Sequence, residues 1–164
     1  IGVVRMAKVI HLELSEVEKA YLAGLIDGEG CLNFYRTSSS SCKRGYTFVA
    51  RLTIVNCDLD TLVGIRERMG IGLVVKKPFR VGENRKQAYA LSFYARELRT
   101  LLPLVMPYLR IKRRQADLLW QYLSSQVWGG SKKGIPEAEW LWRDVLHGKI
   151  SALNRRGAPE TVVN

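Results

Sequence analysis

Two carboxylates stand between glycines at residues 27–30, Asp-Gly-Glu-Gly, directly after an unbroken apolar run. The run, residues 20–26, is typical of a buried helix, and the two glycines predict that the helix ends there. Glu29 would therefore lie beside a helix C-terminus, where the helix dipole disfavours a negative charge. Mg²⁺ takes oxygen ligands and commonly combines one or two carboxylates with phosphate oxygens. Glu29 is thus a candidate metal ligand, the alternative being an ordinary helix-end carboxylate in solvent.

The chain carries a large excess of positive charge, since 26 Lys and Arg against 15 Asp and Glu give a formal charge of +11 over 164 residues. Such an excess favours a polyanionic partner, either nucleic acid or an acidic membrane surface, although it could also serve solubility alone. No apolar run approaches the roughly 20 residues that cross a bilayer. Nucleic acid is therefore the expected partner, and no membrane partner is expected.

The cysteines and histidines show no spacing of a known structural site. Cys31, Cys42 and Cys57 are odd in number and lack a CxxC pair, and His11 and His147 have no partner at ligand spacing. Neither a disulfide framework nor a structural zinc site is expected, and an intracellular location, in cytoplasm or an organelle, is favoured.

Hydrophobic periodicity predicts an α+β fold in the order α-β-β-α-β-β-α, followed by further C-terminal helices. Ser15 and Glu18 form a capping box for the first helix, and Asp58 caps the second. The predicted elements are helices 16–26, 58–69, 95–106, 111–128 and 137–153, and strands 31–37, 46–55, 73–79 and 87–93. Two hairpins predict a four-stranded antiparallel sheet with helices on one face and a polar, open second face. We expect a single domain over residues 15–153, with an N-terminal extension (1–14) and a C-terminal tail (154–164).

Residues 22–30, LAGLIDGEG, closely resemble the LAGLIDADG motif of homing endonucleases. Gly28 and Glu29 replace the Ala and Asp of that motif and keep its small residue and its carboxylate. The resemblance implies a saddle-like sheet and a site-specific DNA endonuclease. One copy of the motif is present, and single-motif members of the family resemble homodimers whose motif helices meet on a two-fold axis. The expected dimer contacts are Tyr21, Ala23, Gly24, Ile26 and Asp27.

The resemblance also implies the catalytic residues. Glu29 and the carbonyl of Gly28 would hold Mg²⁺, for which Mn²⁺ or Ca²⁺ can substitute in a crystal, together with a scissile phosphate. Residues 107–116 resemble the segment of single-motif members that carries a basic active-site residue, and the match places it at Lys112. Cations at the start of a helix oppose its dipole, which favours a phosphate partner over a solvated basic run. Asn56 corresponds to a polar, water-orienting position of the family, the alternative being a residue that simply forms a turn.

The open face of the predicted sheet would lie along double-stranded DNA, because a two-stranded ribbon fits the major groove. Two half-sites of about one turn each imply a pseudo-palindromic target of roughly 20 base pairs. The expected DNA contacts are polar and basic residues of the strands, the turns and the segment after Lys112: Asn33, Tyr35, Thr37, Lys43, Arg44, Thr47, Arg51, Thr53, Lys77, Arg80, Arg85, Lys86, Arg113 and Arg114.

Two other functions remain open from the sequence. An intron RNA maturase would assist splicing of its own intron, which makes intron RNA a further expected partner. A non-catalytic DNA-binding regulator could use the same fold. The presence of Glu29 and of the basic segment at residues 110–114 favours cleavage over both alternatives.

Overall fold

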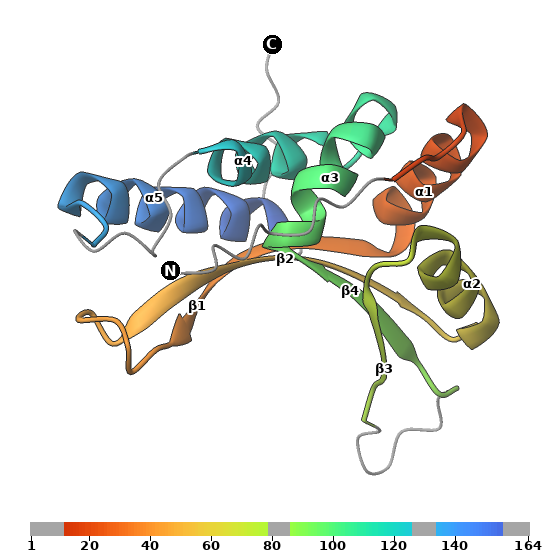
Figure 1. Cartoon of the computed structure of the whole chain (residues 1–164), viewed down its shortest axis with the longest axis horizontal. Helices are drawn as coiled ribbons and strands as arrows, with labels where there is room; N and C mark the ends of the chain where they lie inside the picture. The colour runs from red at the N-terminus through yellow and green to blue at the C-terminus, as the bar shows by residue number, and fades with distance from the viewer. Residues whose placement is uncertain (1–11, 79–85, 126–133, 156–164) are drawn as a thin grey trace, which may run out of the picture.

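The computed structural model describes residues 12–78, 86–125 and 134–155 and has the expected α+β architecture. The helices lie against the convex side of an arched antiparallel sheet, and its concave side carries no helix in the described part of the chain (Figure 1). The elements run in the order α1 (Glu16–Glu29), β1 (Gly30–Ser38), β2 (Tyr46–Asn56), α2 (Leu59–Met69), β3 (Leu73–Lys76), β4 (Tyr89–Tyr94), α3 (Ala95–Val105), the short 3₁₀ helix η1 (Met106–Tyr108), α4 (Arg113–Ser124) and α5 (Glu137–Asn154).

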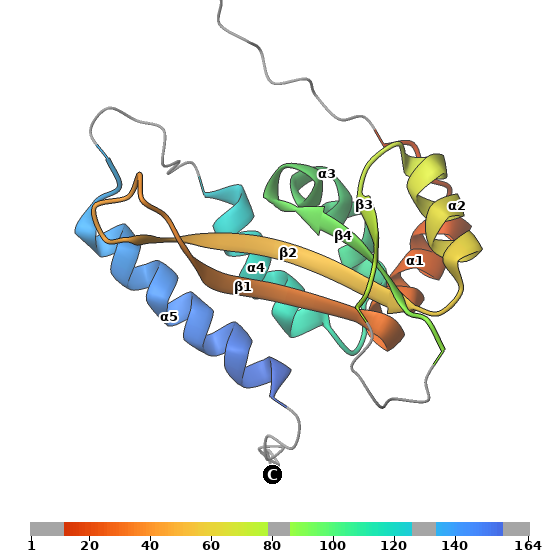
Figure 2. The same ribbon diagram turned by 90° about the horizontal axis from the view of Figure 1, so that it is seen from below.

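The sheet has the strand order β1-β2-β4-β3, and all neighbouring strands are antiparallel. β1 and β2 form a long hairpin, β3 and β4 a short one, and the two hairpins meet where β2 pairs with β4. The predicted four-stranded sheet made of two hairpins is therefore confirmed. Seen from below, no described helix lies in front of the strands of the sheet (Figure 2).

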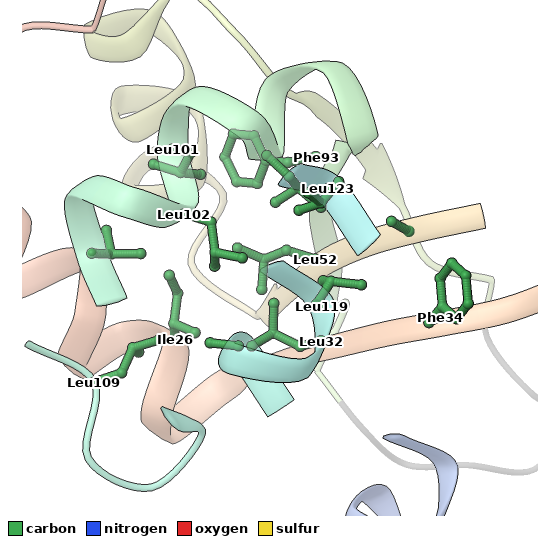
Figure 3. Packing of buried hydrophobic residues seen from close by; sticks show 14 of the residues in the cluster. Ile26, Leu32, Phe34, Leu52, Phe93, Leu101, Leu102, Leu109, Leu119 and Leu123 are labelled. Carbon is green, nitrogen blue, oxygen red and sulfur yellow. The ribbon is translucent and has the colours of Figure 1, made fainter. Parts of the chain in front are cut away.

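The core lies between the convex side of the sheet and the helices (Figure 3). Every second residue of β2 from Phe48 to Ile54 is buried, which is the alternation that the sequence predicts. Leu52 of β2 and Phe93 of β4 pack against Leu102 of α3 and Leu119 of α4, and all four side chains are completely buried. Burial of each such side chain contributes about 1.5–3 kcal/mol, so this layer holds the open face in a fixed shape.

Several element boundaries differ from the sequence prediction; for example, α4 ends at Ser124 rather than at residue 128, and β4 spans Tyr89–Tyr94 rather than residues 87–93. α1 continues through Gly28 to Glu29, because one glycine is tolerated inside a helix and Gly30 begins the strand without an intervening loop. β3 ends at Lys76 rather than at residue 79, and α4 begins at Arg113, with Lys112 in the N-cap position. The second helix keeps its predicted limits because Asp58 caps its start and Gly70, in the left-handed conformation, ends it.

α5 runs beside the outer edge of β1 and closes it (Figure 2). His147 Nδ1 lies 2.6 Å from the carbonyl oxygen of Phe34, and the Asn154 amide donates to the carbonyl of Leu32 at 2.8 Å. Arg36 adds an ion pair to Asp144 at 2.6 Å. Edge strands present unpaired backbone groups, and here side chains of a helix occupy two of them.

Among the described helices, none has the length and apolar character that a membrane span requires.

Candidate active site and nucleic-acid interface

The helix–strand junction places Glu29 at the surface. Glu29 is the last residue of α1 and is exposed, as is Gly28, whereas Gly30 is buried. A Cβ atom on Gly30 would lie 2.5 Å from the carbonyl oxygen of Ile26, so only glycine allows the chain to pass directly from helix to strand here. Within the described residues the Glu29 carboxylate has no hydrogen-bond or ion-pair partner. It is therefore open to a ligand.

Asp27 has a different role from Glu29, although only one residue separates them. Its carboxylate accepts hydrogen bonds from the backbone N–H of Arg110 at 2.8 Å and of Lys112 at 2.9 Å. Burial raises the pKa of Asp27, but the backbone hydrogen bonds outweigh this effect, so that its pKa is lowered overall. The side chain is thus turned into its own chain and fixes the segment that precedes α4, and the dimer contact expected at Asp27 stays a prediction.

This anchoring brings Lys112 to the end of α1. The Lys112 ammonium donates a hydrogen bond to the backbone carbonyl of Asp27, and the side chain is half-buried. Helix C-terminal carbonyls attract cations, and the last turn of α1 contains no basic residue of its own. Lys112 therefore lies beside the backbone that leads to Gly28 and Glu29. This position agrees with the active-site lysine that the resemblance of residues 107–116 implies.

The two arginines after Lys112 differ in availability. Arg113 is engaged within the chain, since its guanidinium donates to Asp117 at 2.9 Å and to the carbonyl of Met106 at 2.9 Å. Arg114 is exposed and has no such partner among the described residues. Of the two, Arg114 is the better placed to bind a phosphate.

Asn56 lies at the end of β2. The register pairs Gly30 with Ile54, so Asn56 is two residues beyond the start of β1, on the strand next to Glu29. Its side-chain oxygen accepts from the backbone N–H of Asp58 at 2.9 Å, which is the turn-forming contact. The catalytic role of Asn56 stays a prediction. In the structure, Asn56 makes the hydrogen bond expected of its alternative role, that of a residue that forms a turn.

The concave side of the sheet carries the polar side chains that the sequence assigns to DNA contacts. Arg51 lies over the ring of Tyr35, with 5.0 Å between the guanidinium carbon and the ring centroid, and this stacking fixes the direction of the cation. Thr53 contacts Ser92 of β4 at 3.3 Å. The alternation of β1 and β2 places the expected residues on this open face: Asn33, Tyr35, Thr37, Thr47, Arg51 and Thr53.

The remaining expected DNA contacts differ in their surroundings. Arg44 forms an ion pair with Glu137 and lies over the ring of Trp140, with 5.4 Å to the centroid, so its side chain is turned toward α5, and DNA binding by Arg44 stays a prediction. Asn33 accepts a hydrogen bond from Asn154 at 3.1 Å. Lys43, Lys77 and Lys86 lie in or beside the hairpin turns, whereas Arg80 and Arg85 lie outside the described residues.

Sequence reasoning missed Tyr94, Leu73 and Val75 on this open face. Tyr94 lies opposite Arg51 and is 40% exposed. It was missed because the strand was expected to end at residue 93, although the alternation of Ala90 and Ser92 points to position 94. Leu73 and Val75 were missed because apolar residues in a strand suggest a core position.

One side of α1 is exposed and has small or apolar residues at helical spacing: Val17, Tyr21, Gly24 and Gly28. A Cβ atom on Gly24 would meet no atom within 4 Å, so another molecule can approach the backbone here. Ala23 and Ile26, by contrast, are completely buried in the core of this chain. Their expected dimer contacts are therefore wrong, because the opposite side of the helix is the one that remains free.

Comparison with known proteins agrees with this geometry. Residues 22–122 match the family described as LAGLIDADG endonuclease. The curated DNA endonuclease I-CvuI of Chlorella vulgaris is 28% identical over 110 residues, which cover 66% of this chain and 65%, just under two thirds, of that protein. Solved structures at lower identity show the same fold. A crystal structure of I-CvuI with a DNA target in the presence of Mg has a TM-score of 0.69 at 24% identity and covers 88% of this chain and 87% of that one. The homing endonuclease I-LtrWI bound to its target DNA has a TM-score of 0.67 at 18% identity and covers 92% of this chain and 48% of that one.

Proposed function

Because the chain belongs to the LAGLIDADG endonuclease family, we propose that it is an intracellular, sequence-specific DNA endonuclease that cuts both strands of a long, pseudo-palindromic site. The observation that carries this proposal is the arrangement at the end of α1. Glu29, an exposed carboxylate without a partner among the described residues, lies at the junction with the sheet. Lys112 binds the carbonyl of Asp27 in the same last turn of α1, and the open polar face of the sheet begins there. The junction of α1 and β1 thus connects the candidate catalytic residues with a surface suited to DNA recognition.

The donor set at this end fits a hard divalent cation such as Mg²⁺. No group of three or more Asp, Glu, His or Cys side chains gathers anywhere in the described ranges, so a cation would need ligands from outside this chain. Mg²⁺ binds in this way, with one or two carboxylates, phosphate oxygens and water. Glu29 and the carbonyl of Gly28 would hold the ion, and a bound divalent metal polarises a phosphoryl group and generates hydroxide from water.

The basic groups of the chain would act directly on the DNA. The Lys112 ammonium, positioned by Asp27, would offset negative charge that grows on the phosphate during hydrolysis. Arg114 would bind a neighbouring phosphate, and the concave face would contact base edges in the major groove. Asn56 is the remaining candidate for orienting the attacking water.

A homodimer would supply the second cut. Val17, Tyr21, Gly24 and Gly28 form an exposed side of α1 that has small residues where a second helix would approach. A two-fold contact of this side with its copy would place one Glu29 on each strand of the DNA. Gly24→Leu should then convert the dimer to a monomer in sedimentation, whereas a monomeric wild-type chain at working concentration would contradict this part of the proposal.

The central experiment selects binding sites for the full chain from a randomised DNA duplex library and then adds Mg²⁺ to the selected duplex. We expect steeply salt-dependent binding of a pseudo-palindromic sequence and double-strand cleavage that requires the metal. Glu29→Gln should retain binding and lose cleavage. Binding without any metal-dependent cleavage would indicate a DNA-binding regulator instead, and splicing assistance without DNA cleavage would indicate a maturase.

A further inference from the structure

The open face of the sheet is not uniformly polar, because one end of it is apolar. Leu73 is 54% exposed and Val75 is 43% exposed. Opposed residues in an antiparallel pair point to the same face, and Leu73 pairs with Ser92 and Val75 with Ala90. Ser92 also pairs with Thr53 of the open face, whereas Val74, between the two apolar residues, pairs with the buried Leu91. Leu73 and Val75 therefore point out of the open face.

This apolar end lies at the end of the sheet where α1 passes into β1, although β3 is the outer strand on the side opposite β1. The cross-strand row Val55–Ala90–Val75 lies one residue beyond Ile54, which pairs with Gly30, the residue that follows Glu29. Ala90 is small and 95% buried between its larger neighbours, so Val55 and Val75 stand on either side of it. We call Val55, Leu73, Val75 and Ala90 the apolar patch.

The charge of the molecule selects the class of partner for the apolar patch. A chain with charge +11 attracts DNA, and the proposed function already assigns a second copy of the chain to the exposed side of α1 rather than to this face. β3 has only four residues and is followed by Lys77, and a short strand with lysine beside it disfavours pairing with another strand edge. The patch is also continuous with the polar residues that the proposed function assigns to base contacts, beginning at Thr53.

In the major groove the apolar feature of a base edge is the 5-methyl group of thymine. We propose that Leu73 and Val75 recognise thymine methyl groups in the base pairs of each half-site that lie nearest the cut. The 5-methyl group of thymine offers these side chains apolar surface to bury, which the other base edges in the major groove lack. The inference rests on the proposed function and adds a base preference to it.

The test starts from the duplex selected by the wild-type chain. We expect thymine at fixed positions near the centre of the selected site. Replacing each of these thymines by uracil removes only the methyl group and should weaken binding about fourfold per position, as expected for one buried methyl-sized group. Uracil at thymines in the outer part of each half-site should have little effect.

Two substitutions locate the effect on the protein. Leu73→Asn and Val75→Asn should each reduce the preference for thymine at the central positions and abolish the uracil effect there. Leu141 and Val145 of α5 serve as matched controls, because they are 57% and 55% exposed and lie away from the open face. Leu141→Asn and Val145→Asn should leave the selected sequence unchanged.

The outcomes separate this inference from the proposed function. Absence of any selected sequence would overturn both together. A selected and cleaved site that lacks central thymines, or that tolerates uracil at them, would overturn the apolar patch as a thymine reader and leave the endonuclease intact. The same conclusion would follow if Leu73→Asn and Val75→Asn altered only sedimentation, because the patch would then bind another chain. The uracil experiment uses the wild-type protein, so a variant that fails to fold does not decide the result.

Discussion

The C-terminal ends of α1 and α2 differ in a way that separates stability from chemistry. α2 ends with Arg66 and Arg68 in its last turn and with Gly70 in the left-handed conformation, both of which suit a helix C-terminus. α1 ends with Asp27 and Glu29, has no basic residue in its last turn and passes directly into a strand. Its missing cation comes from Lys112, far along the chain. A helix C-terminus selected for stability alone would not carry two carboxylates or depend on a distant lysine. The end of α1 is therefore organised for a function in addition to stability.

The N-terminal ends sharpen the contrast. Ser15 and Glu18 form a complete capping box on α1, and Asp58 caps α2. Arg68 at the end of α2 donates to Glu18 at the start of α1 at 2.6 Å, so the favourable end charges of the two helices also pair with each other. Of the four ends of this helix pair, the C-terminus of α1 is the one whose side-chain charges are unfavourable on balance, because Arg66 and Arg68 outweigh Glu67 at the end of α2.

The largest expected effect comes from Glu29→Gln. Loss of the charged ligand should slow cleavage about a thousandfold or more, which corresponds to several kcal/mol of transition-state stabilisation. The same change should raise the free energy of unfolding by about 0.5 kcal/mol, because it removes a negative charge from a helix C-terminus. Glu67→Gln, in the exposed last turn of α2, is the matched control and should leave cleavage unchanged. Equal effects of the two substitutions on cleavage would remove the contrast between the helix ends.

The next largest effect is expected from Gly30→Ala. The new methyl group would lie 2.5 Å from the Ile26 carbonyl oxygen, an atom of the backbone that cannot rotate away, so we expect a loss of about 3 kcal/mol in urea denaturation. Gly70→Ala meets no atom within 4 Å and only incurs the left-handed conformation at φ 65°, which costs about 1 kcal/mol. Equal losses for both glycines would show that close packing at the end of α1 contributes nothing.

Asp27→Asn should have an intermediate effect. It weakens the charge-assisted hydrogen bonds to the N–H groups of Arg110 and Lys112, and we expect a loss of about 1.5 kcal/mol at neutral pH. Because the pKa of Asp27 is lowered in the folded chain, this contribution exists above the ordinary carboxyl pKa and disappears as the pH falls through the lowered value. The stability difference between wild type and variant should therefore shrink in acid. A difference that is independent of pH would contradict the role of the charge.

The smallest effect concerns the paired ends of the two helices. Hydrogen bonding by the backbone N–H of Ser15, and then by Arg68, lowers the pKa of Glu18 to about 2 from an ordinary value of 4.5. The stabilisation is thus complete above pH 4.5 and is lost as the pH falls toward 2. Glu18→Gln should lower Tm slightly at neutral pH and match the wild type near pH 2. A lower Tm that persists at pH 2 would point to lost packing rather than lost charge.

Local patterns predicted the fold because each acts over a few residues. The limits of α2 follow from a capping aspartate and a left-handed glycine, and the faces of β2 follow from strict alternation. The position of Glu29 as a helix-end carboxylate also followed from the sequence. The extra turn of α1 did not, because a glycine at position 28 is compatible with either a helix or its end.

The features of the candidate site that the sequence did not predict have a different cause, since they depend on distant contacts. A helix that is apolar on all sides does not reveal which side faces its own core, so Ala23 and Ile26 were assigned to a partner. Arg44 pairs with Glu137, a residue 93 positions away, and local spacing contains no information about such a contact. The apolar residues Leu73 and Val75 resemble core positions until the strand register places them on the open face.

The direct passage of α1 into β1 has a consequence for how an endonuclease of this kind changes its target during evolution. With no loop at the junction, the distance between Glu29 and the residues of β1 is set by the covalent chain. Side chains on the open face can then be exchanged, and the preferred sequence can drift with them, while the position of the cut relative to the protein stays the same. Under the proposed function, selection on recognition and selection on hydrolysis thereby act on separate residues, and a lineage can acquire a new target without rebuilding the end of α1.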